Sequence, residues 1–213
     1  MRGRFLVVDG IDGCGKTTQL RHLTDWLPES GLMPAGARLI QTREPGGTPL
    51  GLALRQLLLT PPDGSAPVPT AELLLYAADR AQHVERVIRP ALERGDWVIS
   101  DRFAGSTLAY QGYGRGLDRD LILLQLETIA TGGLQPDVTL WLSLPLEDSL
   151  LRRMDQVNDR IEAAGSAFLQ RVCDGFASLA ARRNWSRIDA SRAPALVTAA
   201  IQERLKLALM DPC

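Results

Sequence analysis

The stretch "GIDGCGKTT" (residues 10–18) follows the apolar run "RFLVVD" (residues 4–9) and decides which fold the chain can adopt. It fits the phosphate-loop pattern G-x-x-x-x-G-K-[ST], with Gly10, Gly15, Lys16 and Thr17 at the fixed positions. Glycines let backbone N–H groups turn inward as an anion nest, and a helix beginning near Lys16 adds the partial positive charge of its N-terminus. The alternative is a chance Gly-rich turn, but the flanking strand-like and helix-like patterns favour a nucleotide-phosphate site.

Lysine usage supports a functional role for the loop lysine. The chain has 24 Lys plus Arg residues, yet only Lys16 and Lys206 are lysines. A compact ammonium group fits inside a phosphate cradle, where a planar guanidinium does not. Lys16 can therefore reach the β- and γ-phosphates of a nucleotide, and the Thr17 hydroxyl can bind Mg²⁺.

The length and bulk composition predict one globular domain over residues 1–213, with 45% hydrophobic and 23% charged residues. The formal net charge of −1 gives no reason to expect a nucleic-acid polymer or an anionic membrane as partner. No apolar run approaches the ~20 residues of a membrane span. Cys14, Cys173 and Cys213 lack metal or disulfide spacing, which favours a reducing cytoplasm. We interpret Cys14 as a small loop residue rather than a reactive thiol.

Short apolar runs alternate with helical patterns along the chain, which is typical of an α/β fold with a parallel sheet covered on both faces. The carboxyl ends of such strands meet at one edge, so Gly10, Arg43 and Asp101 are expected to converge on one crevice. The segment from Gly112 is predicted to be a loop. The expected strands are 4–9, 37–42, 96–101, 137–143 and 185–190, and the expected helices are 15–27, 48–59, 70–94, 105–112, 118–131, 146–154, 163–183 and 194–209.

Two arginine-containing motifs follow predicted strands. In "SDRF" (residues 100–103), Asp101 can hold the water shell of Mg²⁺ and Arg102 can bind phosphate, although a structural ion pair is the alternative. In "TREPGGT" (residues 42–48), Arg43 and nearby N–H groups can grip a second phosphate. The alternative there is a turn that carries an exposed arginine.

Two further motifs can hold a base and its sugar. "LLLYAADRAQH" (residues 73–83) puts Tyr76 and Arg80 on one helix face, where a ring can stack on a base and a guanidinium can bond its edge. A core position is the alternative for Tyr76. "STLAYQGYGRG" (residues 106–116) offers Thr107, Tyr110 and Gln111 near Asp101.

Taken together, these motifs and "DRIE" (residues 159–162) resemble the bacterial thymidylate kinase family, in order across about 160 residues. The resemblance implies a five-stranded P-loop kinase fold with a short mobile lid at about 152–163. It also implies phosphoryl transfer from ATP·Mg²⁺ to dTMP, giving dTDP and ADP for dTTP synthesis, and a homodimer.

The resemblance also implies roles for individual residues. Catalytic roles fall to Lys16, Asp101, Arg102 and Arg153, and the metal site to Thr17 and Asp101. ATP binding is expected for Gly10, Ile11, Asp12, Gly13, Cys14, Gly15, Lys16, Thr17, Thr18 and Arg192. Binding of dTMP is expected for Asp12, Arg43, Tyr76, Arg80, Arg102, Thr107, Tyr110 and Gln111.

The lid is where the chain departs from the family pattern. Some members carry a basic residue directly after the loop aspartate, but that position is Gly13 here, so the arginine is expected from the lid as Arg153. Asp155 stands where an arginine is common and is a possible partner for Arg153. Arg160 is expected to hold the lid shut or to pair with Glu162, while a solvated charged helix is the alternative for the segment.

Three other functional classes compete with this interpretation. Another nucleoside-monophosphate or deoxynucleoside kinase shares the loop and differs in base choice. A GTP-dependent switch needs Asn-Lys-x-Asp, and neither lysine follows an asparagine. A non-catalytic nucleotide-binding subunit does not require the full set of phosphate-binding residues that the chain has.

Overall fold

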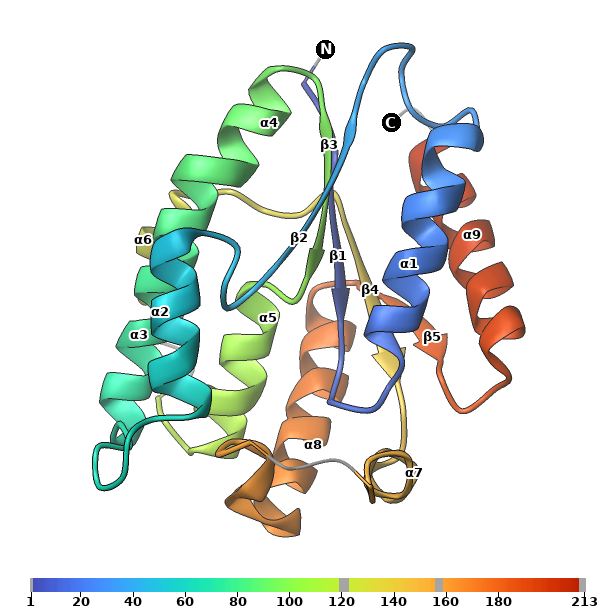
Figure 1. Cartoon of the computed structure of the whole chain (residues 1–213). Coiled ribbons are helices and arrows are strands. Elements are labelled where there is room, and N and C mark those ends of the chain that lie inside the picture. Colours follow the sequence, from blue (N-terminus) through green and yellow to red (C-terminus); the bar gives the residue numbers. More distant parts are fainter. Residues whose placement is uncertain (1, 119–122, 156–158, 211–213) are drawn as a thin grey trace.

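A computed structural model of the chain describes residues 2–118, 123–155 and 159–210 and contains the expected parallel sheet (Figure 1). Its strand order is β2-β3-β1-β4-β5, and each neighbouring pair is parallel. The five strand predictions are confirmed to within two residues at each end. The strands are β1 (Phe5–Asp9), β2 (Leu39–Arg43), β3 (Trp97–Asp101), β4 (Val138–Ser143) and β5 (Ser186–Asp189).

Helices cover both faces of the sheet, as predicted. The central strand β1 is buried along its whole length, which explains its continuous apolar run. The helices are α1 (Lys16–Trp26), α2 (Pro49–Leu59), α3 (Pro69–His83), α4 (Arg89–Glu93), α5 (Ala104–Thr107), α6 (Leu124–Thr131), α7 (Leu146–Arg152), α8 (Ser166–Arg182) and α9 (Pro194–Met210). Short 3₁₀ turns span Leu27–Glu29 and Glu162–Ala164.

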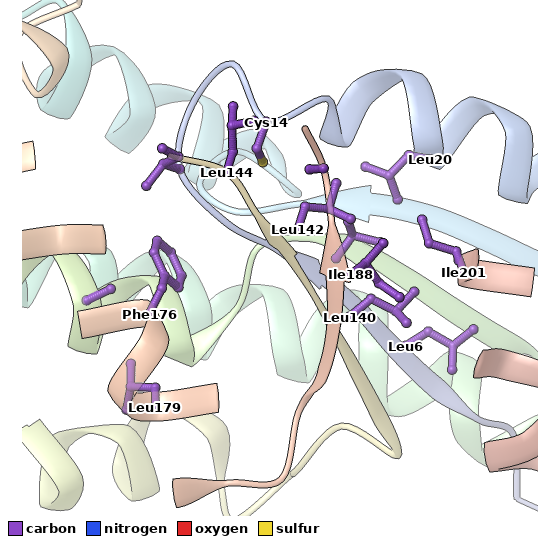
Figure 2. Packing of buried hydrophobic residues seen from close by; sticks show 14 of the residues in the cluster. Leu6, Cys14, Leu20, Leu140, Leu142, Leu144, Phe176, Leu179, Ile188 and Ile201 are labelled. Carbon is purple, nitrogen blue, oxygen red and sulfur yellow. The ribbon is translucent and has the colours of Figure 1, made fainter. Parts of the chain in front are cut away.

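The larger part of the core lies around β4 and β5. Figure 2 shows Leu140 and Ile188 of these strands between Leu20 and Ile201 on one side and Phe176 on the other. The first side belongs to α1 and α9, and the second belongs to α8. A smaller cluster on β1 and β3 packs against the segment that joins α3 to α4. Packing on both faces holds the strands in place, and the loops that follow their carboxyl ends are therefore held at one edge of the sheet.

Two predicted helices contain π-helical turns. The expected helix 70–94 runs as α3, a π-helical turn at Val84–Ile88, and α4. The expected helix 105–112 continues from α5 through a π-helical stretch, Leu108–Gly114, so the predicted loop from Gly112 is wrong there. Arg171 of α8 donates to the carbonyl of Gly114, and this bond holds the end of the stretch. Such widened turns are frequent at functional sites.

Two predictions lie partly outside the described residues. The expected helix 118–131 includes 119–122, and the expected lid 152–163 includes 156–158. No helix in the described part of the chain is long and apolar enough to cross a membrane.

Candidate active site

The phosphate loop joins β1 to α1 and closes around its own lysine. Gly10 has φ +143°, and a Cβ there would stand 2.7 Å from the carbonyl oxygen of Leu142, so only glycine fits this approach. Lys16 begins α1 and is buried, with its Nζ 3.1 Å from the Gly10 carbonyl oxygen and 3.0 Å from that of Ile11. The ammonium group therefore lies within the curl of the loop, at the N-terminus of a helix.

Three strand ends meet beside this loop, as the topology predicts. Arg43 pairs with Asp101 in the sheet register, and Asp101 also pairs with Val8 of β1. The backbone N–H of Glu44 donates to the Asp101 carbonyl at 2.9 Å, which ties the second motif to the third strand. Arg43 is exposed at this edge.

Arg102 connects the loop to the residues that follow β3. Its backbone takes the left-handed conformation, with φ +70°, which is uncommon for a side-chain-bearing residue outside a functional site. Its guanidinium donates to the Gly10 carbonyl at 2.9 Å and to the Asp12 carboxylate. Asp12 also accepts from the Tyr110 hydroxyl at 2.8 Å. Although burial raises the pKa of Asp12, the charges of Arg102 and Lys16 hold it well below its usual range.

A cleft beside this cluster gathers the predicted acceptor residues. Tyr76 and Arg80 of α3 lie on its wall, and Ile161 and Asp159 of the lid segment also line it. Arg43 does not line the cleft. The other residues expected to bind dTMP all line it: Asp12, Tyr76, Arg80, Arg102, Thr107, Tyr110 and Gln111.

Arg80 is held by a buried network that sequence reasoning missed. Its Nε lies 2.9 Å from Glu44 Oε2, and its Nη2 lies 2.9 Å from the Thr107 hydroxyl. The other carboxylate oxygen of Glu44 lies 2.9 Å from His83 Nδ1, and Nε2 of that ring lies 2.7 Å from the Thr42 hydroxyl. The signal was present in the sequence, because Glu44 directly follows Arg43 in "TREPGGT" and His83 ends the Tyr76 motif.

The arginines of the lid take different partners from those expected. Arg153 is buried with its Nη1 2.7 Å from Glu162 Oε1, so Asp155, which is exposed, is not its partner. Arg160 pairs with Glu72 of α3 at 2.6 Å, so its expected pairing with Glu162 is wrong. A solvated charged helix is also wrong for this segment, because Arg153 and Arg160 are held in ion pairs, although the third arginine, Arg152, is exposed.

The turn "DRIE" explains this arrangement locally. The Asp159 carboxylate accepts from the backbone N–H groups of Ile161 and Glu162, and Glu162 in turn accepts from the N–H of Asp159. This reciprocal pattern of side-chain to backbone hydrogen bonds resembles that of a capping box at a helix N-terminus. It fixes the turn so that Ile161 is buried while Arg160 and Glu162 face separate partners.

The loop after β5 approaches the phosphate loop from the other side. Arg152 donates to the Ala190 carbonyl at 3.0 Å and to the Gly13 carbonyl at 3.4 Å. Gln19 of α1 donates to the Pro194 carbonyl at 3.1 Å. Arg192 is exposed in this turn. The turn therefore lies beside the first helix and the phosphate loop.

Thr17 and Asp101, the residues expected to bind the metal, each carry a side-chain oxygen. Thr17 is exposed in the first turn of α1, and Asp101 has one carboxylate oxygen, Oδ1, that is buried with no hydrogen-bond partner among the described residues. An orphaned carboxylate oxygen at the edge of a phosphate site suits a hard cation. Among the described residues, no group of three or more His, Cys, Asp or Glu side chains forms a protein-only metal site.

Cys14 faces the core rather than the crevice. It is a free cysteine, buried among the apolar side chains that Figure 2 shows. Burial raises the pKa of its thiol, with Lys16 as the largest opposing influence. The interpretation of Cys14 as a small packing residue fits this environment.

Comparisons with known proteins agree with this geometry. The thymidylate kinase family model matches residues 8–201. The chain is 70% identical to a thymidylate kinase of Parasynechococcus marenigrum (strain WH8102), over 96% of this chain and 98% of the relative. It is 66% identical to a thymidylate kinase of Prochlorococcus marinus (strain MIT 9313), over 97% and 95%. The crystal structure of thymidylate kinase from Ehrlichia chaffeensis matches with a TM-score of 0.77 and 31% identity, over 97% of this chain and 100% of that chain.

Proposed function

The chain belongs to the thymidylate kinase family, and we propose that the crevice on its phosphate loop is where the γ-phosphoryl group of ATP passes to dTMP. The enzyme phosphorylates dTMP to dTDP, so its substrates are small molecules. One observation carries the assignment of the site. The phosphate loop and the cleft lined by Tyr76 and Arg80 share a wall, because Arg102 bonds the Gly10 carbonyl and also lines the cleft.

The loop side of the crevice holds ATP in this proposal. Lys16 and the N-terminus of α1 favour the phosphates, and Arg192 serves the base side. The bonds from Arg152 and Gln19 to the turn after β5 support this orientation, since they keep that turn beside α1. The residues assigned to the phosphates are Gly10, Ile11, Asp12, Gly13, Cys14, Gly15, Lys16, Thr17 and Thr18.

Mg²⁺ fits the residues at the edge of the loop. Thr17 and Asp101 would hold it, Asp101 through the carboxylate oxygen that has no partner among the described side chains. When bound, the ion neutralises charge on the phosphates. Lys16 and Arg102 supply the protein's own positive charge near the same phosphates.

The cleft side holds dTMP in this proposal. Arg102 and the exposed Arg43 bind the acceptor phosphate, and Asp12 and Tyr110 face the sugar. Tyr76 stacks on the base, while Arg80, Thr107 and Gln111 bond its edge. The buried clamp of Glu44 on Arg80 supports this role, because a guanidinium held on one side offers its remaining N–H groups in a fixed direction.

Arg153 is assigned to the transferring phosphoryl group, as part of a lid at about 152–163 on a single kinase domain. Transfer spreads charge over three oxygens of the moving group, which favours a further guanidinium beside Lys16, Arg102 and the metal ion. The contact of the Arg153 stem with Gly13 supports the assignment, since it keeps the residue against the phosphate loop.

A homodimer completes the proposal. α3 packs between α2 and α6, and these three helices lie on one side of the molecule in Figure 1. They expose large apolar side chains there, among them Leu57, Leu74 and Ile129, which is 76% exposed. Such a face is typical of a protein interface. The free thiols of Cys14 and Cys173 support the cytoplasm as the compartment.

A coupled ADP-release assay tests the proposed chemistry. Purified enzyme receives ATP and Mg²⁺ with dTMP, dUMP, AMP or GMP as acceptor, and parallel reactions contain EDTA. We expect the highest kcat/KM with dTMP and loss of turnover in EDTA. Preference for AMP or GMP would point to another nucleoside-monophosphate kinase, and full activity in EDTA would contradict the cation site.

A further inference from the structure

Glu72 of α3 is a buried carboxylate that three residues from two other segments of the chain contact. Its side chain has no exposed surface. Oε1 accepts from Gln111 Nε2 at 2.8 Å and from Arg115 Nε at 3.1 Å. Oε2 accepts from Arg115 Nη2 at 2.9 Å and from Arg160 Nη2 at 2.6 Å. One carboxylate thus joins the end of the π-helical stretch, through Gln111 and Arg115, to Arg160 of the lid.

The charge state of Glu72 fixes which way the Gln111 amide points. Burial raises the pKa of Glu72, but the hydrogen bonds from Arg115, Gln111 and Arg160 outweigh it and hold the pKa below its usual value. An ionised carboxylate has acceptors and no donor. Gln111 must therefore turn its NH₂ group toward Glu72, which leaves its carbonyl oxygen as the group for the cleft.

A second buried carboxylate does the same for Arg80. Glu44 and Thr107 take the donors on Nε and Nη2, and both Arg80 and Gln111 line the cleft. The cleft therefore offers N–H donors from one residue and a carbonyl acceptor from the other. A thymine or uracil edge presents a carbonyl oxygen at C4 and an N–H at N3, whereas cytosine presents an amino group and a bare nitrogen.

We propose that Glu72 is a positioning residue that fixes the Gln111 amide for a keto pyrimidine and holds Arg160 of the lid beside the same cleft. The inference rests on the proposed function, because it takes this cleft as the acceptor site. Arg160 also donates to the Leu58 carbonyl at 2.8 Å, so its guanidinium bridges the end of α2 and Glu72. Base reading and lid position then depend on a single carboxylate.

Substitution Glu72→Gln tests the positioning role. The new amide is similar in size but presents both donors and an acceptor, so it no longer dictates the orientation of Gln111. Dissociation constants of dTMP and dCMP are measured by competition titration for the wild type and the variant. We expect the preference for dTMP over dCMP to fall at least about 10-fold, since a site built on fixed hydrogen bonds rejects the wrong edge strongly.

Glu127→Gln is the matched control. Glu127 is a buried carboxylate that pairs with Arg183 at 2.9 and 2.8 Å but does not line the cleft. Its variant loses a comparable ion pair and is expected to keep the dTMP preference. If Glu72→Gln weakens both nucleotides equally and keeps their ratio, Glu72 is only structural and the inference is overturned. A wild type that does not prefer dTMP would instead contradict the proposed function.

Two further variants separate the roles of Glu72. Arg160→Gln removes only the ion pair between the lid and Glu72, so we expect a higher KM for dTMP while the base preference is retained. An unchanged KM would overturn the lid role. Gln111→Met removes the amide while Glu72 stays, and serves if Glu72→Gln does not fold. It is expected to lower the dTMP preference at least about 10-fold, and an unchanged preference would overturn the base-reading role.

Discussion

Arg153 lies against Gly13 of the phosphate loop, so closely that a Cβ on Gly13 would stand 3.1 Å from Arg153 Cγ and 3.3 Å from its Cδ. The lid-side arginine thus takes the space that a side chain at position 13 would need. The absence of a basic side chain in the loop and the presence of this arginine are two parts of one arrangement. Arg153 also forms an ion pair with Glu162 of the lid, which restrains its guanidinium.

Arg153→Ala is expected to lower kcat by at least about 10²-fold with little change in dTMP binding, because an arginine on the transferring phosphoryl group acts mainly in the transition state. Steady-state kinetics with dTMP varied at saturating ATP measures both quantities. Arg187→Ala is the control, since Arg187 is an exposed arginine over the Trp141 ring. If Arg153→Ala keeps most of its kcat while Arg160→Ala loses it, the role belongs to Arg160.

Tyr76→Ala is expected to weaken dTMP binding about 5- to 150-fold at constant ATP affinity, because base–aromatic stacking contributes roughly 1–3 kcal/mol. Titration calorimetry with each nucleotide gives the two affinities. Tyr76→Phe keeps the ring and should bind dTMP as the wild type does. Tyr76 lines the cleft and is only partly buried, so the alanine variant is expected to fold. An unfolded alanine variant would argue for a core role instead.

Ile129→Lys is expected to convert the proposed dimer to a monomer. The residue lies on α6, is 76% exposed, and a charge there would be desolvated in an interface built on this face. Light scattering coupled to size exclusion measures the mass over a range of concentrations. Leu207→Lys on α9 is a control, because Leu207 is also exposed but lies on another helix. A wild-type monomer at all concentrations would refute the homodimer.

The sequence was sufficient for most of the fold, because continuous apolar strands and long helical patterns carry strong periodic signals. The motifs shared with the family also pointed to residues that line one cleft, among them Tyr76, Arg80 and Gln111, although Arg43 does not line it. The partners of the charged residues were harder to predict. Glu72 accepts from Arg160, which is 88 positions away, and such long-range pairing leaves no local trace.

Asp79→Asn is expected to flatten part of the pH dependence of stability. Burial, followed by the charge of Glu44, raises the pKa of Asp79 from 3.8 to about 6. The folded protein therefore binds the Asp79 proton more tightly than the unfolded chain does. This difference adds to the free energy of unfolding below pH 4, and the contribution is lost as pH rises through about 6.

Denaturant unfolding at pH 5 and pH 8 checks this expectation. The asparagine keeps an oxygen for the Gly46 N–H, which donates to Asp79 Oδ1 at 3.1 Å. Relative to the variant, the wild type should have a higher unfolding free energy at pH 5 than at pH 8. A difference between the two proteins that does not vary with pH would show that Asp79 has no raised pKa.

The central claim is that the phosphate loop of this chain directs the γ-phosphoryl group of ATP onto dTMP, and label transfer tests it most directly. Wild type and Lys16→Ala are each incubated with dTMP, Mg²⁺ and ATP labelled on the γ-phosphorus, and the labelled dTDP is quantified. The account predicts labelled dTDP from the wild type and none above background from Lys16→Ala, with both proteins showing the same cooperative unfolding. Labelled dTDP from a folded Lys16→Ala variant at near wild-type rate would contradict it.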